Sequence, residues 1–245
     1  MKLLCCVSYK GTEYQGWQKQ KDAPSIQGTI ENVISKILDT ETPIFGSGRT
    51  DSKVHAINQY FHFETKKDLD LDKFRYSINC LLPEDIFLKE IKDVDDDFHA
   101  RYSAKSKTYT YKIRFGERNP LFNDLETNIP YDLDANLLII SLQLFKGTHN
   151  FIDFTSKEDD EDSYVRTIFD VETKYDENEK LFEVTFKGDG FMRYQIRFMV
   201  GAALAVASHK EDESYISSHL KDKAEREIVS YKAEPQGLYL VDVEY

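Results

Sequence analysis

The chain has 245 residues, of which 40% are hydrophobic and 13% aromatic, so it is globular and long enough for one domain or two. Its 44 acidic and 32 basic residues give a net charge of -12, which argues against a nonspecific DNA or RNA binder. No apolar run is long enough to cross a membrane, and the first residues, MKLLCCVSYKGTEY, become polar too soon for a signal peptide. We therefore expect a cytoplasmic protein without membrane or DNA partners.

The first half of the chain predicts alternating strands and helices. An apolar run predicts a strand over residues 3–9, and Ser25 is typical of the N-cap of a helix over residues 26–38. Residues 44–45 lead into a glycine-rich turn, which a strand over residues 58–65 follows. A helix over residues 71–82 closed by Pro83, and then a strand over residues 86–94, complete this half.

The second half shows a looser version of the same order. The sequence predicts strands over residues 104–115, 167–175, 181–187 and 237–245, and helices over residues 133–145 and 191–208. Residues 156–164, SKEDDEDSY, are expected to be an exposed acidic loop. The pattern predicts an α+β protein of two similar halves, 1–102 and 103–245, around a largely antiparallel central sheet with a cleft between the halves.

Cysteine and histidine spacing indicates no metal site. Cys5 and Cys6 are adjacent in a predicted strand, so their side chains point to opposite faces and cannot easily bridge or join Cys80 at a zinc ion. The six histidines lack the short spacing of metal ligands, and no glycine fingerprint for a nucleotide phosphate is present. We expect reduced core thiols, no metal and no cofactor.

One segment is basic although the chain is acidic. Residues 98–118, FHARYSAKSKTYTYKIRFGER, contain a single acid, Glu117, and predict a local basic cleft. Strand periodicity in this segment places Tyr109 on one face with Lys107 and Tyr111, at a change from apolar to basic character, although an ordinary half-buried strand tyrosine explains it equally well. The basic residues are Arg101, Lys105, Lys107, Lys112, Arg114 and Arg118.

Two further positions suggest chemistry. In residues 46–56, GSGRTDSKVHA, Asp51 lies two residues after Arg49, and it is either a reactive carboxylate or the cap of a turn or short helix. Arg197 lies in the apolar run GFMRYQIRFMVGAAL, where a charge needs a partner, either a catalytic carboxylate or a structural one. Arg193, one helical turn away, can extend its head group to solvent.

Together these segments resemble the TruA family of tRNA pseudouridine synthases. The family patterns YDG-x-x-Y-x-GWQ and GRTD-x-GVHA correspond to YKGTEYQGWQ and GRTDSKVHA in this chain. FHARYSAKSKTYTY, VRTI, GFMRYQIRFMVG and GLYLV match further family segments in the same order along the chain.

The resemblance implies ferredoxin-like halves in a pseudouridine synthase fold, a homodimer, no cofactor, and tRNA as the substrate. Target uridines would lie in the anticodon stem-loop, at tRNA positions 38, 39 or 40. It makes Asp51 the catalytic nucleophile or base, Tyr109 the residue that stacks on the target base and moves a proton, and Arg197 the partner of the aspartate. Substrate contacts are expected from Arg49, Lys53, His55, Arg101, Lys105 and Lys107.

The chain departs from the family at a few positions. Lys53 replaces the usual glycine, so it either adopts an unfavourable left-handed conformation or contributes a phosphate contact. Lys10 replaces an aspartate, and the segment before VRTI is acidic instead of basic. Two alternatives to a synthase remain. The first is an RNA-binding relative that has lost full catalysis or acts as a tRNA-folding chaperone. The second is a hydrolase that pairs Asp51 with a second carboxylate.

Overall fold

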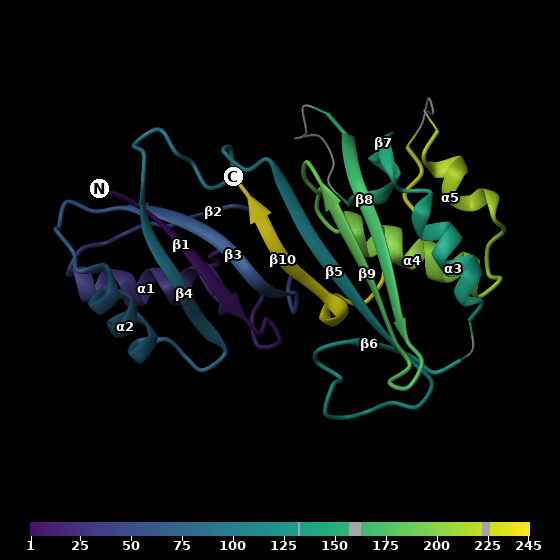
Figure 1. The fold of residues 1–245 in the computed structure, drawn as a ribbon, viewed down its shortest axis with the longest axis horizontal. Helices are drawn as coiled ribbons and strands as arrows, with labels where there is room; N and C mark the ends of the chain where they lie inside the picture. Colours follow the sequence, from purple (N-terminus) through teal and green to yellow (C-terminus); the bar gives the residue numbers. More distant parts are fainter. Residues whose placement is uncertain (132, 157–162, 222–225) are drawn as a thin grey trace. The chain divides into compact units, whose positions relative to one another are not determined.

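The computed structural model describes residues 1–131, 133–156, 163–221 and 226–245, and its elements form two units of mixed α+β structure (Figure 1). The first unit contains residues 1–105 and 239–245, and the second contains residues 106–238. The end of the chain belongs to the first unit because the final strand pairs with a strand of that unit. The predicted α+β class is confirmed.

In the first unit, four strands form a sheet in the order β4-β1-β3-β10. Neighbouring strands are antiparallel except β10 and β3, which are parallel. The short β2 pairs with β3. Figure 1 shows α1 and α2 next to each other beside this sheet. The elements are β1 (Lys2–Tyr9), α1 (Ile26–Leu38), β2 (Phe45–Gly46), β3 (His55–Glu64), α2 (Leu71–Leu81), β4 (Ile86–Val94) and β10 (Leu238–Glu244).

Capping residues determine where the helices of the first unit begin. The Ser25 hydroxyl accepts a hydrogen bond from the Gly28 N–H at 3.2 Å, and the Asp70 carboxylate accepts one from the Lys73 N–H at 3.1 Å. Such caps satisfy backbone donors that have no partner inside the helix. The predicted helices over residues 26–38 and 71–82 and the predicted strand over residues 86–94 are confirmed to within one residue.

In the second unit, antiparallel strands form a sheet in the order β5-β9-β8-β7, and β6 pairs in parallel with β5. Helices α3 and α4 pack on each other, and Figure 1 shows them grouped with α5 beside the sheet. The elements are β5 (Ser106–Phe115), β6 (Thr127–Ile129), α3 (Ala135–Gln143), β7 (Gly147–Asn150), η1 (Ile152–Phe154), β8 (Val165–Asp176), β9 (Leu181–Gly188), α4 (Gln195–Ala207), α5 (Ser214–His219) and η2 (Pro235–Gly237).

Burial alternates along β5 as its sequence predicts. Tyr109, Tyr111 and Ile113 are buried, whereas the residues between them are partly exposed. Tyr109 lies opposite Phe186 in the neighbouring β9. The position of this tyrosine is therefore set by an antiparallel register that extends over the whole strand.

The apolar helix of the second unit begins later than the sequence predicts. We expected it to start at residue 191, but α4 starts at Gln195, because Tyr194 has a φ of 64°. A right-handed helix cannot continue through a residue in this left-handed conformation. Residues 191–194 therefore form a connection into the helix. Their side chains point in directions that differ from those they would have in a longer helix.

The cysteine prediction is wrong for one of three residues. Cys5 and Cys6 are free and buried in β1, as expected of core thiols, whereas Cys80 is free and exposed on α2. Burial, followed by the charge of Cys6, raises the pKa of the Cys5 thiol well above its usual value. The two buried thiols, those of Cys5 and Cys6, therefore both belong to strand β1.

The expected acidic loop and the expected absence of a membrane span complete the comparison with the sequence predictions. Most of the predicted acidic loop, namely residues 157–162, lies outside the described residues. Among the helices that the structure describes, none combines the length and the apolar character needed to cross a bilayer.

Candidate active site

Asp51 lies in the first unit, in the loop between β2 and β3. No helix begins there; instead the Val54 N–H donates a hydrogen bond to the Asp51 carbonyl oxygen at 3.2 Å and closes a turn. Thr50 is buried, Asp51 is half-buried, and Arg49 and Lys53 are exposed. The backbone of Asp51 therefore takes part in the turn.

The segment that matches the first family motif packs directly on this loop. The Tyr9 hydroxyl and the Thr50 hydroxyl are hydrogen-bonded at 2.8 Å. The Trp17 N–H donates to the Thr50 carbonyl oxygen at 3.0 Å, and the Lys53 N–H donates to the Tyr14 carbonyl oxygen at 3.3 Å. Both sides of Asp51 are thus bonded to residues 9–17, a role for this motif that the sequence pattern alone did not reveal.

The close approach of the two segments requires glycine. Gly16 has a φ of 90°, and a Cβ atom added there would lie 2.6 Å from the Thr50 carbonyl oxygen and 3.0 Å from the Asp51 carbonyl carbon. Contacts this short are far inside van der Waals distance, so a side chain at residue 16 would displace the loop. Gly11 lies equally close to the far end of the turn, with an added Cβ 2.0 Å from the Val54 carbonyl oxygen.

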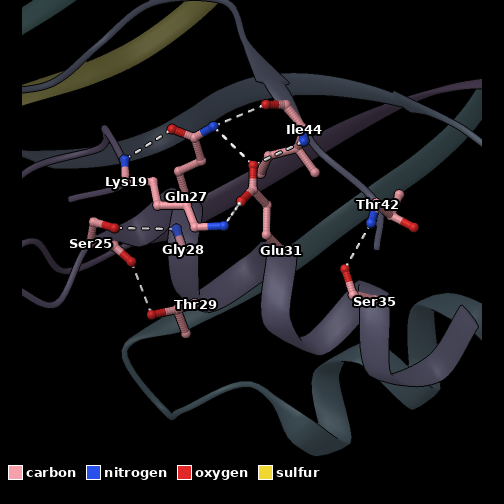
Figure 2. Close-up of polar contacts among 9 residues, drawn as sticks. All are labelled: Lys19, Ser25, Gln27, Gly28, Thr29, Glu31, Ser35, Thr42 and Ile44. Carbon is pink, nitrogen blue, oxygen red and sulfur yellow. Dashed lines mark hydrogen bonds and ion pairs between the residues drawn. The ribbon is translucent and has the colours of Figure 1, made fainter. Parts of the chain in front are cut away.

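A polar network supports the chain on its way into the loop (Figure 2). The nearly buried Glu31 carboxylate accepts hydrogen bonds from the Gln27 side chain at 3.0 Å and the Ile44 N–H at 3.1 Å, and it pairs with the Lys19 ammonium group at 2.9 Å. Gln27 also donates to the Ile44 carbonyl oxygen at 3.1 Å. The hydrogen bond to Glu31 raises the pKa of Lys19. Helix α1 therefore connects the chain just after Trp17 to the residue that precedes β2.

His55 supports the same loop from inside the first unit. It is 2% exposed, its ring lies 4.8 Å from that of Tyr239, and its Nδ1 atom accepts a hydrogen bond from the Gly11 N–H at 3.0 Å. This acceptor role requires Nδ1 to be unprotonated. The expected contact of His55 with substrate stays a prediction, and the observed hydrogen bond gives His55 a part in positioning Gly11 against the turn.

In the second unit, Arg197 is buried in the first turn of α4. Only 8% of the residue is exposed, which agrees with the burial that its apolar context predicts. Its Nε atom donates to the Ala233 carbonyl oxygen at 2.8 Å, and the Ala233 N–H donates back to the Arg197 carbonyl oxygen at 2.9 Å. This reciprocal pair fixes the direction of the guanidinium group.

The segment that carries Ala233 is itself fixed on both sides. A Cβ atom added to Gly201 in α4 would lie 2.5 Å from the Tyr231 carbonyl oxygen, so the helix and this segment are in direct backbone contact. The buried Tyr111 hydroxyl donates to the Glu234 carbonyl oxygen at 2.6 Å. Burial raises the pKa of Tyr111, so this phenol remains a hydrogen-bond donor.

Tyr109 belongs to the same unit as Arg197. It is 8% exposed, and its ring meets that of Phe191 edge to face at 5.3 Å. The second unit thus contains two of the three expected catalytic residues, and the first contains Asp51. The ion pair between Asp51 and Arg197 remains a proposal.

The basic segment is less positive than its sequence suggests. Lys112 pairs with Glu183 at 3.2 Å, and Arg114 pairs with Glu126 and, at 3.6 Å, with Glu179. These acids lie outside residues 98–118 in the sequence, so counting charges within the segment could not reveal them. Among the expected substrate contacts, Arg101 and Lys105 are exposed and Lys107 is partly exposed.

Replacement of Gly16 by alanine is expected to disturb the Asp51 loop. The added methyl group must overlap the Thr50 carbonyl and adopt a positive φ, so Gly16→Ala should lower the free energy of unfolding by about 2–4 kcal/mol. Urea unfolding measures this change. Gly190→Ala is the matched control, because an added Cβ meets nothing within 4 Å there. Equal stability of the two variants would contradict the close approach.

Lys53 adopts the left-handed conformation that its family position suggests, with a φ of 65°. Lys53→Gly should therefore raise the free energy of unfolding by about 0.5–1 kcal/mol, because relief of backbone strain exceeds the entropy cost of glycine. The same substitution at Lys36, inside α1, should lower it by about 1 kcal/mol. Thermal unfolding of both variants tests the difference in sign, and a destabilised Lys53→Gly would argue against strain at this residue.

A family model described as tRNA pseudouridine synthase matches residues 5–103 and 142–245. The tRNA pseudouridine synthase A of Streptococcus uberis is 36% identical over 241 residues, covering 98% of this chain and 96% of the relative. The protein of the same name from Geobacillus sp. is 37% identical over 246 residues, covering 100% of this chain and 98% of the relative.

A solved structure titled Crystal Structure of a Cbf5-Nop10-Gar1 Complex matches 82% of this chain and 54% of the other, with 16% identity and a TM-score of 0.34. The curated relatives span nearly the whole chain, and the residues that the family model matches include both the Asp51 loop and the Arg197 helix. The chain therefore belongs to the family of tRNA pseudouridine synthases.

Proposed function

We propose that the protein converts uridine to pseudouridine in the anticodon stem-loop of tRNA, in the cytoplasm and without a cofactor. The observation that carries the proposal is the loop around Asp51, whose backbone is bonded to residues 9–17 on both sides of the aspartate. A catalytic group needs this kind of positioning, because an error of about 1 Å at a reacting atom costs about a hundredfold in rate. An ordinary surface aspartate does not need it.

The proposed reaction is an isomerisation. The bond between N1 of uracil and C1′ of ribose breaks, the base turns, and a bond between C5 and C1′ forms. The hydrogen at C5 leaves as a proton and N1 takes up a proton, so the product has the atoms of the substrate and no electrons are exchanged. The groups required are a carboxylate to start the reaction and a site that holds the detached base.

Three residues supply these groups in the proposal. Asp51 is the nucleophile or base, and Arg197 is the cation that pairs with it and keeps it ionised. The ring of Tyr109 lies against the target base, where stacking contributes about 1–3 kcal/mol, and its hydroxyl group assists proton transfer at C5. The burial of Tyr109 and the fixed direction of the Arg197 guanidinium group support these roles.

The remaining expected residues contact the RNA. A uridine in a stem must leave its base stack, at a cost of a few kcal/mol. In the proposal Arg49, which is exposed two residues before Asp51, fills the vacated space. Lys53, Arg101, Lys105 and Lys107 contact phosphates. His55 acts through the loop that it supports.

The reaction can be tested with tRNA that carries tritium at C5 of uridine. The wild-type protein should release tritium to water without added metal or nucleotide. Asp51→Asn preserves the shape of the side chain and removes its charge and basicity, so it should lower the release rate about a hundredfold or more while tRNA binding persists. Asp93→Asn, an exposed substitution in β4, is the matched control and should release tritium at the wild-type rate.

Three results would overturn this proposal. Tight tRNA binding by the wild-type protein without tritium release would indicate an RNA-binding relative or a folding chaperone. Free uracil in place of pseudouridine among the products would indicate a hydrolase. Full release by Asp51→Asn would move the catalytic role to another carboxylate.

We further propose that the active form is a homodimer. The chain has a net charge of -12, and two copies of residues 98–118 would double the number of exposed cations, such as Arg101 and Lys105, that this segment offers to one tRNA. Light scattering should report a dimer at micromolar concentration. A monomer with full activity at that concentration would refute the dimer and leave the proposed reaction unaffected.

A further inference from the structure

Three cations surround the ring of Tyr194 in the second unit. The Lys232 ammonium group lies 4.5 Å from the ring centroid, and the guanidinium carbons of Arg193 and Arg197 lie 4.8 and 5.2 Å from it. Arg193 also donates a hydrogen bond to the Tyr194 hydroxyl at 3.0 Å. Each cation–ring contact is favourable, but three positive charges around one ring repel one another.

Arg193 and Lys232 are both exposed, and no carboxylate of the described residues lies within ion-pair distance of either. Other exposed basic residues, such as Lys174, share this property, whereas Lys146 pairs with Asp170. The distinguishing feature of Arg193 and Lys232 is that both lie over one aromatic ring, at 4.8 and 4.5 Å from its centroid. In a chain with 44 acidic residues, two neighbouring cations without a carboxylate form a surface that favours an anion.

The backbone conformation at residues 193 and 194 is fixed next to these cations. Tyr194 has a φ of 64°, a conformation that is unfavourable for an aromatic residue and that turns its ring toward the cations. The Thr155 hydroxyl donates to the Arg193 carbonyl oxygen at 3.0 Å, and this bond fixes the residue before Tyr194. Tyr194 is also the N-cap of α4 without a side-chain cap, so the positive end of a thirteen-residue helix lies beside the cluster.

Lys232 is fixed by the same contacts that orient Arg197. It lies between Tyr231, whose carbonyl packs against Gly201, and Ala233, which exchanges two hydrogen bonds with Arg197. The helix that carries the buried arginine and the segment that carries the exposed lysine are therefore held against each other. An anion bound by Lys232 has a defined position relative to the Arg197 guanidinium group.

We propose that Arg193, Lys232 and Tyr194 form a binding site for a backbone phosphate of the tRNA, adjacent to Arg197. This inference rests on the proposed function, since it takes RNA as the source of the phosphate. The head groups of the two cations lie over the ring of Tyr194. We therefore propose that the ligand is an anionic phosphate and not a base that stacks on the ring. Arg197 acts on the carboxylate, whereas Arg193 and Lys232 hold the strand, and the shared tyrosine ring links the two tasks.

The site can be tested by tRNA binding at several salt concentrations. The double variant Arg193→Gln, Lys232→Gln should bind tRNA about tenfold more weakly at physiological salt, and the slope of log Kd against log salt should fall by about one. The control is Lys174→Gln, Lys221→Gln, which removes the same charge from exposed positions outside the cluster. Thermal unfolding confirms that both proteins are folded. Equal affinity and equal slope in the two double variants would overturn the site.

A second measurement identifies the contact itself. RNA hairpins with one methylphosphonate each, at successive linkages around the target uridine, lack one phosphate charge apiece. The wild-type protein should lose affinity at a particular linkage, and the double variant should show no further loss there, because the contact is already absent. Losses that add at every linkage would overturn the site.

Failure of the proposed function gives a different result. A wild-type protein that does not bind tRNA or release tritium overturns both proposals. A wild-type protein that does both, with a double variant that behaves like its control, overturns this inference alone.

Discussion

The structure around the candidate catalytic aspartate depends on one constraint, the contact between two stretches of backbone. Residues 11–16 and 50–54 approach so closely that a side chain at Gly11 or Gly16 would overlap a carbonyl group. The buried Trp17 and Tyr9 bond to Thr50, and the Glu31 network fixes the chain at both ends of this contact. The backbone that carries Asp51, although it belongs to a loop, is thereby held on both sides of the aspartate.

The second unit applies the same principle to an arginine. A buried guanidinium group is costly unless its donors are used, and here a backbone carbonyl, that of Ala233, takes one of them. That carbonyl is fixed because its segment packs on Gly201 and bonds to the hydroxyl of Tyr111. In both units backbone groups orient the side chains expected to react, so a substitution at a distant glycine can change the chemistry without touching a reacting atom.

Several elements were predictable because local signals agree with tertiary burial. Helix α1 has both a serine cap and an apolar face, and β5 alternates clearly, so their positions follow from the sequence. The start of α4 did not follow, because residues 191–194 are as apolar as the helix and nothing in their pattern predicts the left-handed Tyr194. Short elements such as β6 and β7 contain too few residues to show a period. The loop's dependence on residues 9–17 was invisible because it arises from long-range backbone contacts, and the neutralisation of Arg114 by Glu126 and Glu179 is equally nonlocal.

An acidic protein that binds RNA must keep its positive charges where they are needed. Surface ion pairs contribute little to stability, so pairing Lys112 with Glu183 or Lys146 with Asp170 serves mainly to neutralise those cations as nonspecific phosphate contacts. Cations that are not paired with a carboxylate, such as Arg193 and Lys232, then remain available to RNA phosphates on a chain whose acidic residues repel them. Because the net charge of -12 opposes nonspecific binding of RNA, local groups of cations favour particular orientations of a bound strand over many weak ones. Specific placement on the RNA can thus arise from the acidic residues of the chain as much as from its exposed lysine and arginine residues.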